Sequence, residues 1–311
     1  MQKRLVVTSS PHLRDSISTQ RIMMEVCLAL LPAGIASVVL FGVDALKLIA
    51  VSVLTCVLTE YLYQRLTGRK VTVGDFSAVV TGLLLAYNIP ANAPVWMPAV
   101  GGVIAILLVK QCFGGVGSNF LNPALSARAV LFVSWGSIMG SYPAPRTMLD
   151  GVSGATPLSV LAGGGDVKLM DLFLGNIPGV LGETCKLAIL LGGVYLIVRG
   201  IIDWKIPVCM ILTTFVCYLL RDGAYVALAE VLSGGLLLGA FFMATDYVTS
   251  PVSNLGRVIM GVGCGLLVFV IRAFANYPEG CSFAILFMNV LTPVIDRFTE
   301  PKFFGEVKKH G

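Results

Sequence analysis

The sequence contains few charged residues and almost no histidine. Charged residues make up 13% of the 311 residues, against about 25% in a typical soluble domain. The only two histidines, His12 and His310, stand near the two ends of the sequence, which excludes a haem held between two histidines inside a membrane. Hydrophobic residues make up 56%. This composition excludes an ordinary soluble domain and indicates a protein embedded in a membrane.

The eight cysteines include no C-x-x-C pair. Most lie inside apolar stretches, where a free cysteine behaves as a small hydrophobe. This spacing argues against an iron–sulfur cluster held by this chain alone, and we predict no metal site. The net charge of +5 does not indicate nucleic acid, because the basic residues stand at the ends of the apolar stretches and form no single patch.

Repeated apolar stretches of about 20 residues predict an all-α, polytopic membrane protein with about ten transmembrane helices. The polar N-terminal residues, with four basic side chains and no apolar segment, predict a cytoplasmic tail instead of a cleavable signal. The first half (1–140) therefore holds this tail and five helices, and the second half (183–311) holds five helices and a C-terminal tail, with a loop (141–182) between them. The expected spans are 22–41, 45–64, 75–88, 95–113, 124–140, 183–198, 206–220, 225–243, 255–274 and 281–295.

Lysine and arginine are distributed unevenly between the two sides of this topology. With the N-terminus inside, sixteen of the 22 fall on the cytoplasmic side and six outside. This bias predicts cytoplasmic termini and an extracytoplasmic 141–182 loop in the plasma (inner) membrane. The six outside are Lys47, Arg146, Lys168, Lys186, Arg221 and Arg272.

One span in each half contains an interruption. Gly82 is followed by LLLAYNIPANAP, which ends at Pro94, and Gly239 is followed by AFFMATDYVTSP, which ends at Pro251. Polar, proline-containing backbone at membrane depth must be buried in protein or line a water-filled cavity. Paired interruptions predict inverted 5+5 repeats with a shared site near the midplane. The alternative is two ordinary loops of similar length.

The external loop contains the sequence Asp150-Gly-Val-Ser-Gly-Ala-Thr156-Pro. Its small residues let the chain bend and present one hydroxyl, that of Thr156. On composition alone, a glycine-rich surface turn is the simpler interpretation. The pattern D-x-x-S-G-A-T, however, resembles the motif on which a dedicated flavin transferase attaches FMN to threonine through a phosphoester.

The resemblance extends over nearly the whole chain. SSPHLR, GGVGSNFLNPALSARA, SGATPLS and GAFFMATDYVTSPVS resemble the family that includes the D subunit of the Rnf ferredoxin:NAD oxidoreductase complex. This family also includes the B subunit of the sodium-translocating NADH:quinone reductase. The resemblance implies covalent FMN on Thr156, with Asp150, Ser153, Gly154 and Ala155 as transferase recognition residues and neighbours of the flavin phosphate.

The function implied by the resemblance is electron relay. The chain would pass electrons between an extracytoplasmic flavoprotein subunit and other membrane carriers of a multi-subunit complex, coupled to transport of Na⁺ or H⁺. A flavin transferase would be its maturation partner. The interrupted helices alone also permit a passive channel or transporter, which would have no use for the flavin motif.

Two further features remain open at this stage. The run from Gly114 to Asn119 follows a membrane helix instead of a strand, so it predicts a turn and not a phosphate loop. The resemblance implies a second, noncovalent flavin, riboflavin, in some members, and this turn with the interrupted spans is where its pocket is expected.

Ionisable residues in or near the spans are solvated or paired at the boundary, or line an ion path. They are Glu25, Glu60, Asp75, Glu230 and Asp246, of which Glu230 is the best candidate for a buried role.

Overall fold

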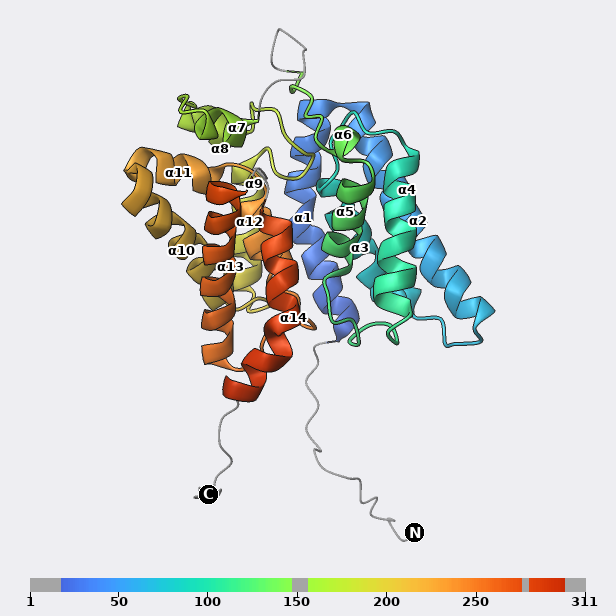
Figure 1. Ribbon diagram of the computed structural model, residues 1–311. Coiled ribbons are helices and arrows are strands. Elements are labelled where there is room, and N and C mark those ends of the chain that lie inside the picture. Colours follow the sequence, from blue (N-terminus) through green and yellow to red (C-terminus); the bar gives the residue numbers. More distant parts are fainter. Residues whose placement is uncertain (1–17, 147–155, 276–279, 300–311) are drawn as a thin grey trace, which may run out of the picture.

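The computed structural model describes residues 18–146, 156–275 and 280–299, and within them the regular structure is entirely helical (Figure 1). The first half contains α1 (Thr19–Phe41), α2 (Val43–Leu66), η1 (Val73–Asp75), α3 (Ser77–Tyr87), α4 (Trp96–Val103), the π-helix η2 (Ile104–Gln111), α5 (Pro123–Ser134) and α6 (Gly136–Met139). Two short helices follow, α7 (Pro157–Ala162) and α8 (Leu169–Leu174). The second half contains α9 (Lys186–Val198), α10 (Lys205–Asp222), α11 (Ala224–Leu232), α12 (Leu236–Leu238), the π-helix η3 (Gly239–Met243), α13 (Asn254–Phe274) and α14 (Cys281–Thr299).

Local sequence explains where several helices begin. The side chains of Ser18, Asn122 and Ser253 each accept a main-chain N–H of the first turn that follows, which makes them N-caps. Asn122 is followed by Pro123, whose fixed φ suits the first helical position. Gly42 alone separates α1 from α2, and its φ of +77° is one that a residue with a Cβ rarely adopts.

Helix length and composition indicate a multi-pass membrane protein. Four described helices, α1, α2, α13 and α14, are long and apolar enough to cross a membrane. A fifth candidate is the pair formed by α11 and the α12–η3 segment, which are bent by 65° relative to each other. Four further apolar helices have 10 to 17 residues, or about 15–26 Å at 1.5 Å per residue, less than a hydrocarbon core of about 30 Å. Ten full spans therefore stay a prediction.

The two halves pack in corresponding ways. α2 packs against α3 and α4, and α10 packs against α11 and α13. Between the halves, α1 contacts α9 and α5 contacts α14. Inverted repeats, predicted from the paired interruptions, agree with this packing but are not established by it.

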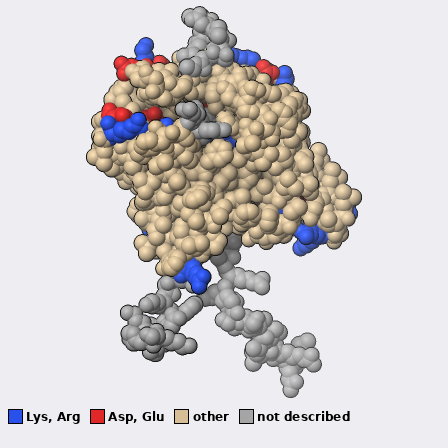
Figure 2. Space-filling view, viewed as in Figure 1, with Lys and Arg blue, Asp and Glu red and all other residues tan. Residues whose placement is uncertain are grey.

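The bundle has two distinct ends. The first turn of α1 and the last turn of α14 lie at the lower end in Figure 1, whereas α7 and α8 lie at the upper end, over α11. In Figure 2 a broad band around the middle of the visible face carries no lysine, arginine or acidic side chains, and the charged residues lie above and below it. This distribution is the one expected of a protein that crosses a bilayer.

Candidate functional site

Thr156 is the one residue of the loop motif that the structure describes; Asp150, Ser153, Gly154 and Ala155 lie outside the described residues. Thr156 is the N-cap of α7, with extended backbone, and its hydroxyl oxygen accepts the Ser159 main-chain N–H at 3.3 Å. The hydroxyl also donates to Ser159 Oγ at 3.3 Å. Only 7% of Thr156 is exposed. The residue expected to carry the flavin is thus held at the head of a short helix by two long hydrogen bonds.

The segment that follows Thr156 packs on α11. Leu172 and Ile177 are buried in a cluster with Ala229 of α11, and the Tyr225 hydroxyl donates to the Val167 carbonyl. The loop of the sequence analysis is therefore tied to the helices of the second half by apolar contacts and by a hydrogen bond.

The two interrupted helices meet at a buried polar junction in the middle of the bundle. Asn88, which follows α3, contacts Met243, the last residue of η3, through Nδ2 and Sδ at 3.8 Å. Arg128 of α5 donates from one guanidinium nitrogen to Asn88 Oδ1 at 2.9 Å and to Ser282 Oγ of α14 at 2.7 Å. Asn122 Nδ2 donates to the Met243 carbonyl at 3.2 Å. These bonds satisfy groups that the broken helices would otherwise bury without partners.

The segments after the two breaks lie at opposite ends of the bundle. Residues 89–93 lie beyond the C-terminal end of α3, where Ile89 accepts a hydrogen bond from Leu181 and Pro90 pairs with Val180. Residues 245–248 instead line a cavity that reaches the N-terminal ends of α1 and α3. The two segments therefore do not form the single shared site expected from the sequence; only the ends of the helices that precede them meet.

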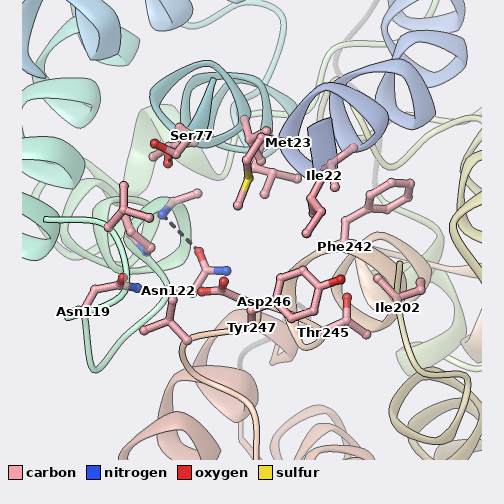
Figure 3. Close-up of a pocket in the computed structure, with 18 of the residues that line it drawn as sticks. Ile22, Met23, Ser77, Asn119, Asn122, Ile202, Phe242, Thr245, Asp246 and Tyr247 are labelled. Carbon is pink, nitrogen blue, oxygen red and sulfur yellow. Dashed lines mark hydrogen bonds between the residues drawn. The ribbon is translucent and has the colours of Figure 1, made fainter. Parts of the chain in front are cut away.

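The cavity, shown in Figure 3, has a volume of about 100 Å³ and lies at the N-terminal ends of α1 and α3, away from α7. In the close-up, Ile22, Met23 and Ser77 lie on one side, and Asn119, Asn122, Asp246 and Tyr247 lie on the other, with Phe242 and Ile202 near one edge. Apolar walls with a few convergent polar groups are typical of small-molecule sites, but this volume is below the range of about 300–1,000 Å³ that such sites usually have. The turn after Gly114 and the second interruption thus meet at one cavity.

A buried ion pair adjoins the cavity wall. The Lys110 ammonium, at the end of η2, donates to Glu60 Oε2 of α2 at 2.7 Å and to Ser77 Oγ of α3 at 2.7 Å. Glu60 is completely buried and also accepts from Gln111 Nε2 at 2.9 Å and from Gln64 Nε2 at 3.3 Å. The pair joins α2, α3 and η2 beside the cavity, which both Lys110 and Ser77 line.

Several basic residues are buried inside the protein. The lysine and arginine count assigns Lys110 and Arg128 to the cytoplasmic side and Lys186 to the outside, and the side chains of all three are buried. Glu60 is expected to be solvated or paired with an arginine near the boundary, whereas its partner is Lys110, fifty residues away in sequence. Long-range packing decides such pairs, and no local sequence signal would have identified them.

The remaining acidic residues fall into different environments. Glu230 is buried as expected and pairs at 3.1 Å with Arg272 of α13, a residue that the charge count places outside the membrane core. Glu25 pairs with Arg199 near the surface. Asp246 lines the cavity and accepts from the Thr249 hydroxyl at 3.3 Å.

The fold and the site define a multi-pass helical membrane protein with two interrupted helices, a polar interior and a hydroxyl-bearing segment at one end. Residues 6–305 match the model of the NQR2, RnfD, RnfE family, and the chain belongs to this family. It is 49% identical over 309 residues to the D subunit of the Na⁺-translocating ferredoxin:NAD⁺ oxidoreductase complex of Acetobacterium woodii, and the match covers 98% of this chain and 96% of that protein.

Two other relatives match over nearly their full length. The chain is 40% identical to the D subunit of the proton-translocating ferredoxin:NAD⁺ oxidoreductase complex of Clostridium ljungdahlii, over 96% of each chain. It is 39% identical to the D subunit of the ion-translocating oxidoreductase complex of Stutzerimonas stutzeri, over 93% of this chain and 92% of that protein. The resemblance inferred from the sequence motifs is thereby confirmed at the level of the family.

Proposed function

We propose that this chain is the membrane subunit of an ion-translocating ferredoxin:NAD⁺ oxidoreductase complex that relays electrons through FMN bound covalently to Thr156. The electrons would pass between an extracytoplasmic flavoprotein subunit and other membrane carriers. The observation that carries the proposal is the D-x-x-S-G-A-T motif ending at Thr156, in a chain whose relatives are named as subunits of such complexes. One of these relatives is named as Na⁺-translocating and the other as proton-translocating, so similarity to them does not decide which ion is transported.

The hydrogen bonds of Thr156 are compatible with a phosphoester at its Oγ1. In attachment, Thr156 Oγ would form a bond to the FMN phosphorus of FAD, AMP would leave, and the hydroxyl proton would be released. Esterification removes the hydroxyl as a donor to Ser159 Oγ, but the ester oxygen still accepts the Ser159 N–H, so α7 keeps its cap. The flavin, when bound, supplies electron transfer, while the protein sets its location and surroundings.

Burial of Thr156 has a consequence for maturation. A residue of which only 7% is exposed does not admit its hydroxyl to a transferase active site. We therefore expect the transferase to act before α7 packs against α11, when Leu158 has not yet reached the bend at Gly234. Asp150, Ser153, Gly154 and Ala155 would be recognised in that open form.

The lining of the cavity, and not its present volume of about 100 Å³, suits a second, noncovalent flavin such as riboflavin, so the cavity would have to widen to hold one. Phe241 and Phe242 offer apolar contact to a ring system, and Asn119, Asn122 and Asp246 offer hydrogen bonds to ring edges and hydroxyls. This assignment is independent of Thr156, since the cavity lies at the other end of the bundle.

The same proposal includes the topology. Both termini would be cytoplasmic, and α7 and α8 extracytoplasmic, which is supported by the charge bias and by the opposite placement of these parts in Figure 1. Ten spans in 5+5 inverted repeats are supported by the corresponding packing of α2 with α3 and α4, and of α10 with α11 and α13.

The experiment that tests the proposal is Thr156→Val in the complex made with the transferase present. Valine conserves the shape and removes the nucleophilic oxygen, so in-gel flavin fluorescence of the denatured chain should vanish while the complex assembles. Mass spectrometry of the peptide containing Thr156 should show the mass of bound FMN only in the wild type. Ser153→Ala is the matched control and should lose less flavin, because Ser153 is not the linked residue.

The same samples also distinguish the two flavins. Flavin that is released on denaturation without a covalent link should be unchanged in Thr156→Val. Retention of covalent flavin by Thr156→Val, or a wild-type peptide without added mass, contradicts the proposal and would favour the passive channel or transporter.

A further inference from the structure

A second cavity lies at the end of the bundle that holds the first turn of α1 and the last turn of α14, the lower end in Figure 1. Its wall is formed by the end of α9, the start of α10, the segment after η3 and Arg257 of α13. Glu25 of α1 pairs with Arg199 beside this wall, and Ser253 Oγ donates to Thr299 Oγ1 of α14 at 2.6 Å. The volume of about 410 Å³ falls within the range of about 300–1,000 Å³ usual for ligand sites.

Two basic side chains line this cavity and meet at one carboxylate oxygen. Lys205 Nζ lies 3.0 Å from Asp203 Oδ2, and Arg257 Nη1 lies 2.6 Å from the same atom. Because both nitrogens contact one oxygen, the two cations lie side by side in the wall. Their side chains are 26% and 32% exposed, so both are able to contact a further anion in the cavity.

The charges around the cavity leave an excess of one positive charge. Asp203 is the only acidic residue of the described chain that lines the cavity, and it faces two cations. The acidic residues nearby have other partners: Asp246 accepts a hydroxyl, Glu25 pairs with an arginine outside the cavity, and Asp296 accepts a main-chain N–H. A concave wall with a charge of this sign attracts an anion.

The same wall holds hydrogen-bond donors that are not used within the described residues. Arg257 donates from Nε to the Pro251 carbonyl at 3.2 Å and from Nη1 to Asp203, whereas its Nη2 has no acceptor there. The hydroxyl of Ser250, which also lines the cavity, donates to none of the described residues either. A guanidinium beside an ammonium and a hydroxyl is a donor set that suits phosphate oxygens.

The surroundings of the cavity are those of a membrane surface. Trp204 and Tyr247 line it and are 55% and 54% exposed, and the Lys205 ammonium lies 5.6 Å from the centre of the Trp204 ring. Tryptophan and tyrosine beside basic residues are typical of the membrane–water interface. Val198 and Leu255, at the adjoining helix ends, are exposed apolar side chains. Surface suited to acyl chains therefore adjoins the polar cavity, which favours a lipid over a free ion.

We propose that this cavity binds the phosphate headgroup of an anionic phospholipid, with Arg257, Lys205 and Ser250 as its donors. Basic pockets between membrane helices on the cytoplasmic side bind anionic headgroups in other membrane proteins. The excess positive charge matches the single negative charge of a phosphodiester. In the topology proposed above, the lipid belongs to the cytoplasmic leaflet. Its binding does not depend on Thr156 or on a flavin there.

The lipid site adjoins the cavity of Figure 3. Ile201, Ile202, Thr245 and Tyr247 line both cavities. The Tyr247 hydroxyl donates to the Ile201 carbonyl, which joins the two segments that form the shared wall. A bound headgroup would therefore contact the wall that separates it from the first cavity.

The test is a thermal-stability measurement on the assembled complex in a neutral detergent. This chain carries an epitope tag, and the amount that stays soluble after heating gives its Tm. The additions are phosphatidylglycerol, phosphatidylcholine with the same acyl chains, and inorganic phosphate at equal ionic strength. In the wild type, phosphatidylglycerol should raise the Tm by about 3 °C or more above phosphatidylcholine, through preferential binding to the folded state. Inorganic phosphate should not raise it.

Lys205→Gln should lose the advantage of phosphatidylglycerol, because it removes the excess charge and keeps the pair between Arg257 and Asp203. Arg199→Gln is the matched control: it removes one positive charge at the same end of the bundle, but Arg199 does not line the cavity. It should keep the advantage. If Lys205→Gln does not assemble, Ser250→Leu keeps both cations, fills part of the cavity and is interpreted in the same way.

Equal Tm values in the two lipids for the wild type overturn the proposal, and so does an advantage that is as large in Lys205→Gln as in Arg199→Gln. Stabilisation of the wild type by inorganic phosphate as large as that by phosphatidylglycerol would identify a free anion as the ligand and overturn the lipid assignment. Covalent flavin plays no part in this measurement, so its failure leaves the assignment of Thr156 unaffected.

Discussion

Replacement of Lys110 by methionine should destabilise the protein strongly, because it leaves a carboxylate buried without its cation. Lys110 is 3% exposed and Glu60 is fully buried, and their charged atoms are 2.7 Å apart. Gln111 and Gln64 would still donate to Glu60 Oε1. Oε2, however, would lose the only donor that the described residues offer it.

The size of the effect follows from this geometry. Removing one partner of a buried ion pair costs about 3–5 kcal/mol, and the remaining amide donors place Lys110→Met near the lower value. At about 2–4 °C per kcal/mol, the Tm should fall by roughly 6–12 °C. Glu60→Gln/Lys110→Met removes the buried charge altogether and should recover most of this loss, since a neutral buried pair is often no less stable than an ionic one.

Unfolding can be followed with a thiol-reactive fluorophore in detergent, because Cys56, Cys264 and Cys281 are buried in the folded protein. Lys47→Met is the matched control: Lys47 pairs with Asp44 at 2.9 Å, but both side chains are more than half exposed. A surface pair of this kind contributes about 0–1 kcal/mol. The reasoning is refuted if Lys110→Met is no worse than Lys47→Met, or if the double variant is as unstable as the single one.

Two further predictions concern topology and packing. Reporter fusions at Gly68 and after Lys168 should report cytoplasm and exterior respectively, and a cytoplasmic signal after Lys168 would reverse the proposed orientation. Gly182→Ala should lower the Tm, because the added methyl would lie 2.2 Å from the Cβ of buried Tyr87 and overpacking costs about 1–3 kcal/mol. Gly74→Ala, with no atom within 4 Å of the new methyl, should change the Tm little, and equal effects of the two changes would contradict the packing argument.

The positions of the long helices could be predicted from the sequence because apolar length is a local property. The expected spans at 22–41, 45–64 and 255–274 each lie within, or within two residues of, a helix of the structure. Their starts and ends are set by nearby groups such as the Ser253 side chain and Gly42. No distant contact is needed to locate these helices.

The break inside the expected span 225–243 could not be predicted in the same way. The sequence VLSGGLLLG contains two adjacent glycines in an apolar run, and glycine pairs also occur inside unbroken helices here, as Gly192 and Gly193 do in α9. What distinguishes the bend is its long-range contacts: Lys186 donates to the Gly234 carbonyl and Arg272 donates to the Ser233 carbonyl. These partners lie almost fifty and forty residues away, and neither is suggested by local composition.

The same reasoning explains why the buried charges lie at the breaks. An intact membrane helix satisfies its own backbone groups, whereas a broken one exposes carbonyls and amides that hydrocarbon cannot satisfy. Each break described above is met by a side chain from another helix: Arg128 reaches Asn88, Asn122 reaches the Met243 carbonyl, and Lys186 reaches the Gly234 carbonyl. Each break therefore needs a buried polar side chain to satisfy its backbone groups, and each of these side chains needs those backbone groups as hydrogen-bond partners. Of these three bonds, the one from Asn122 to the Met243 carbonyl joins the two halves of the chain, whereas the other two each lie within one half.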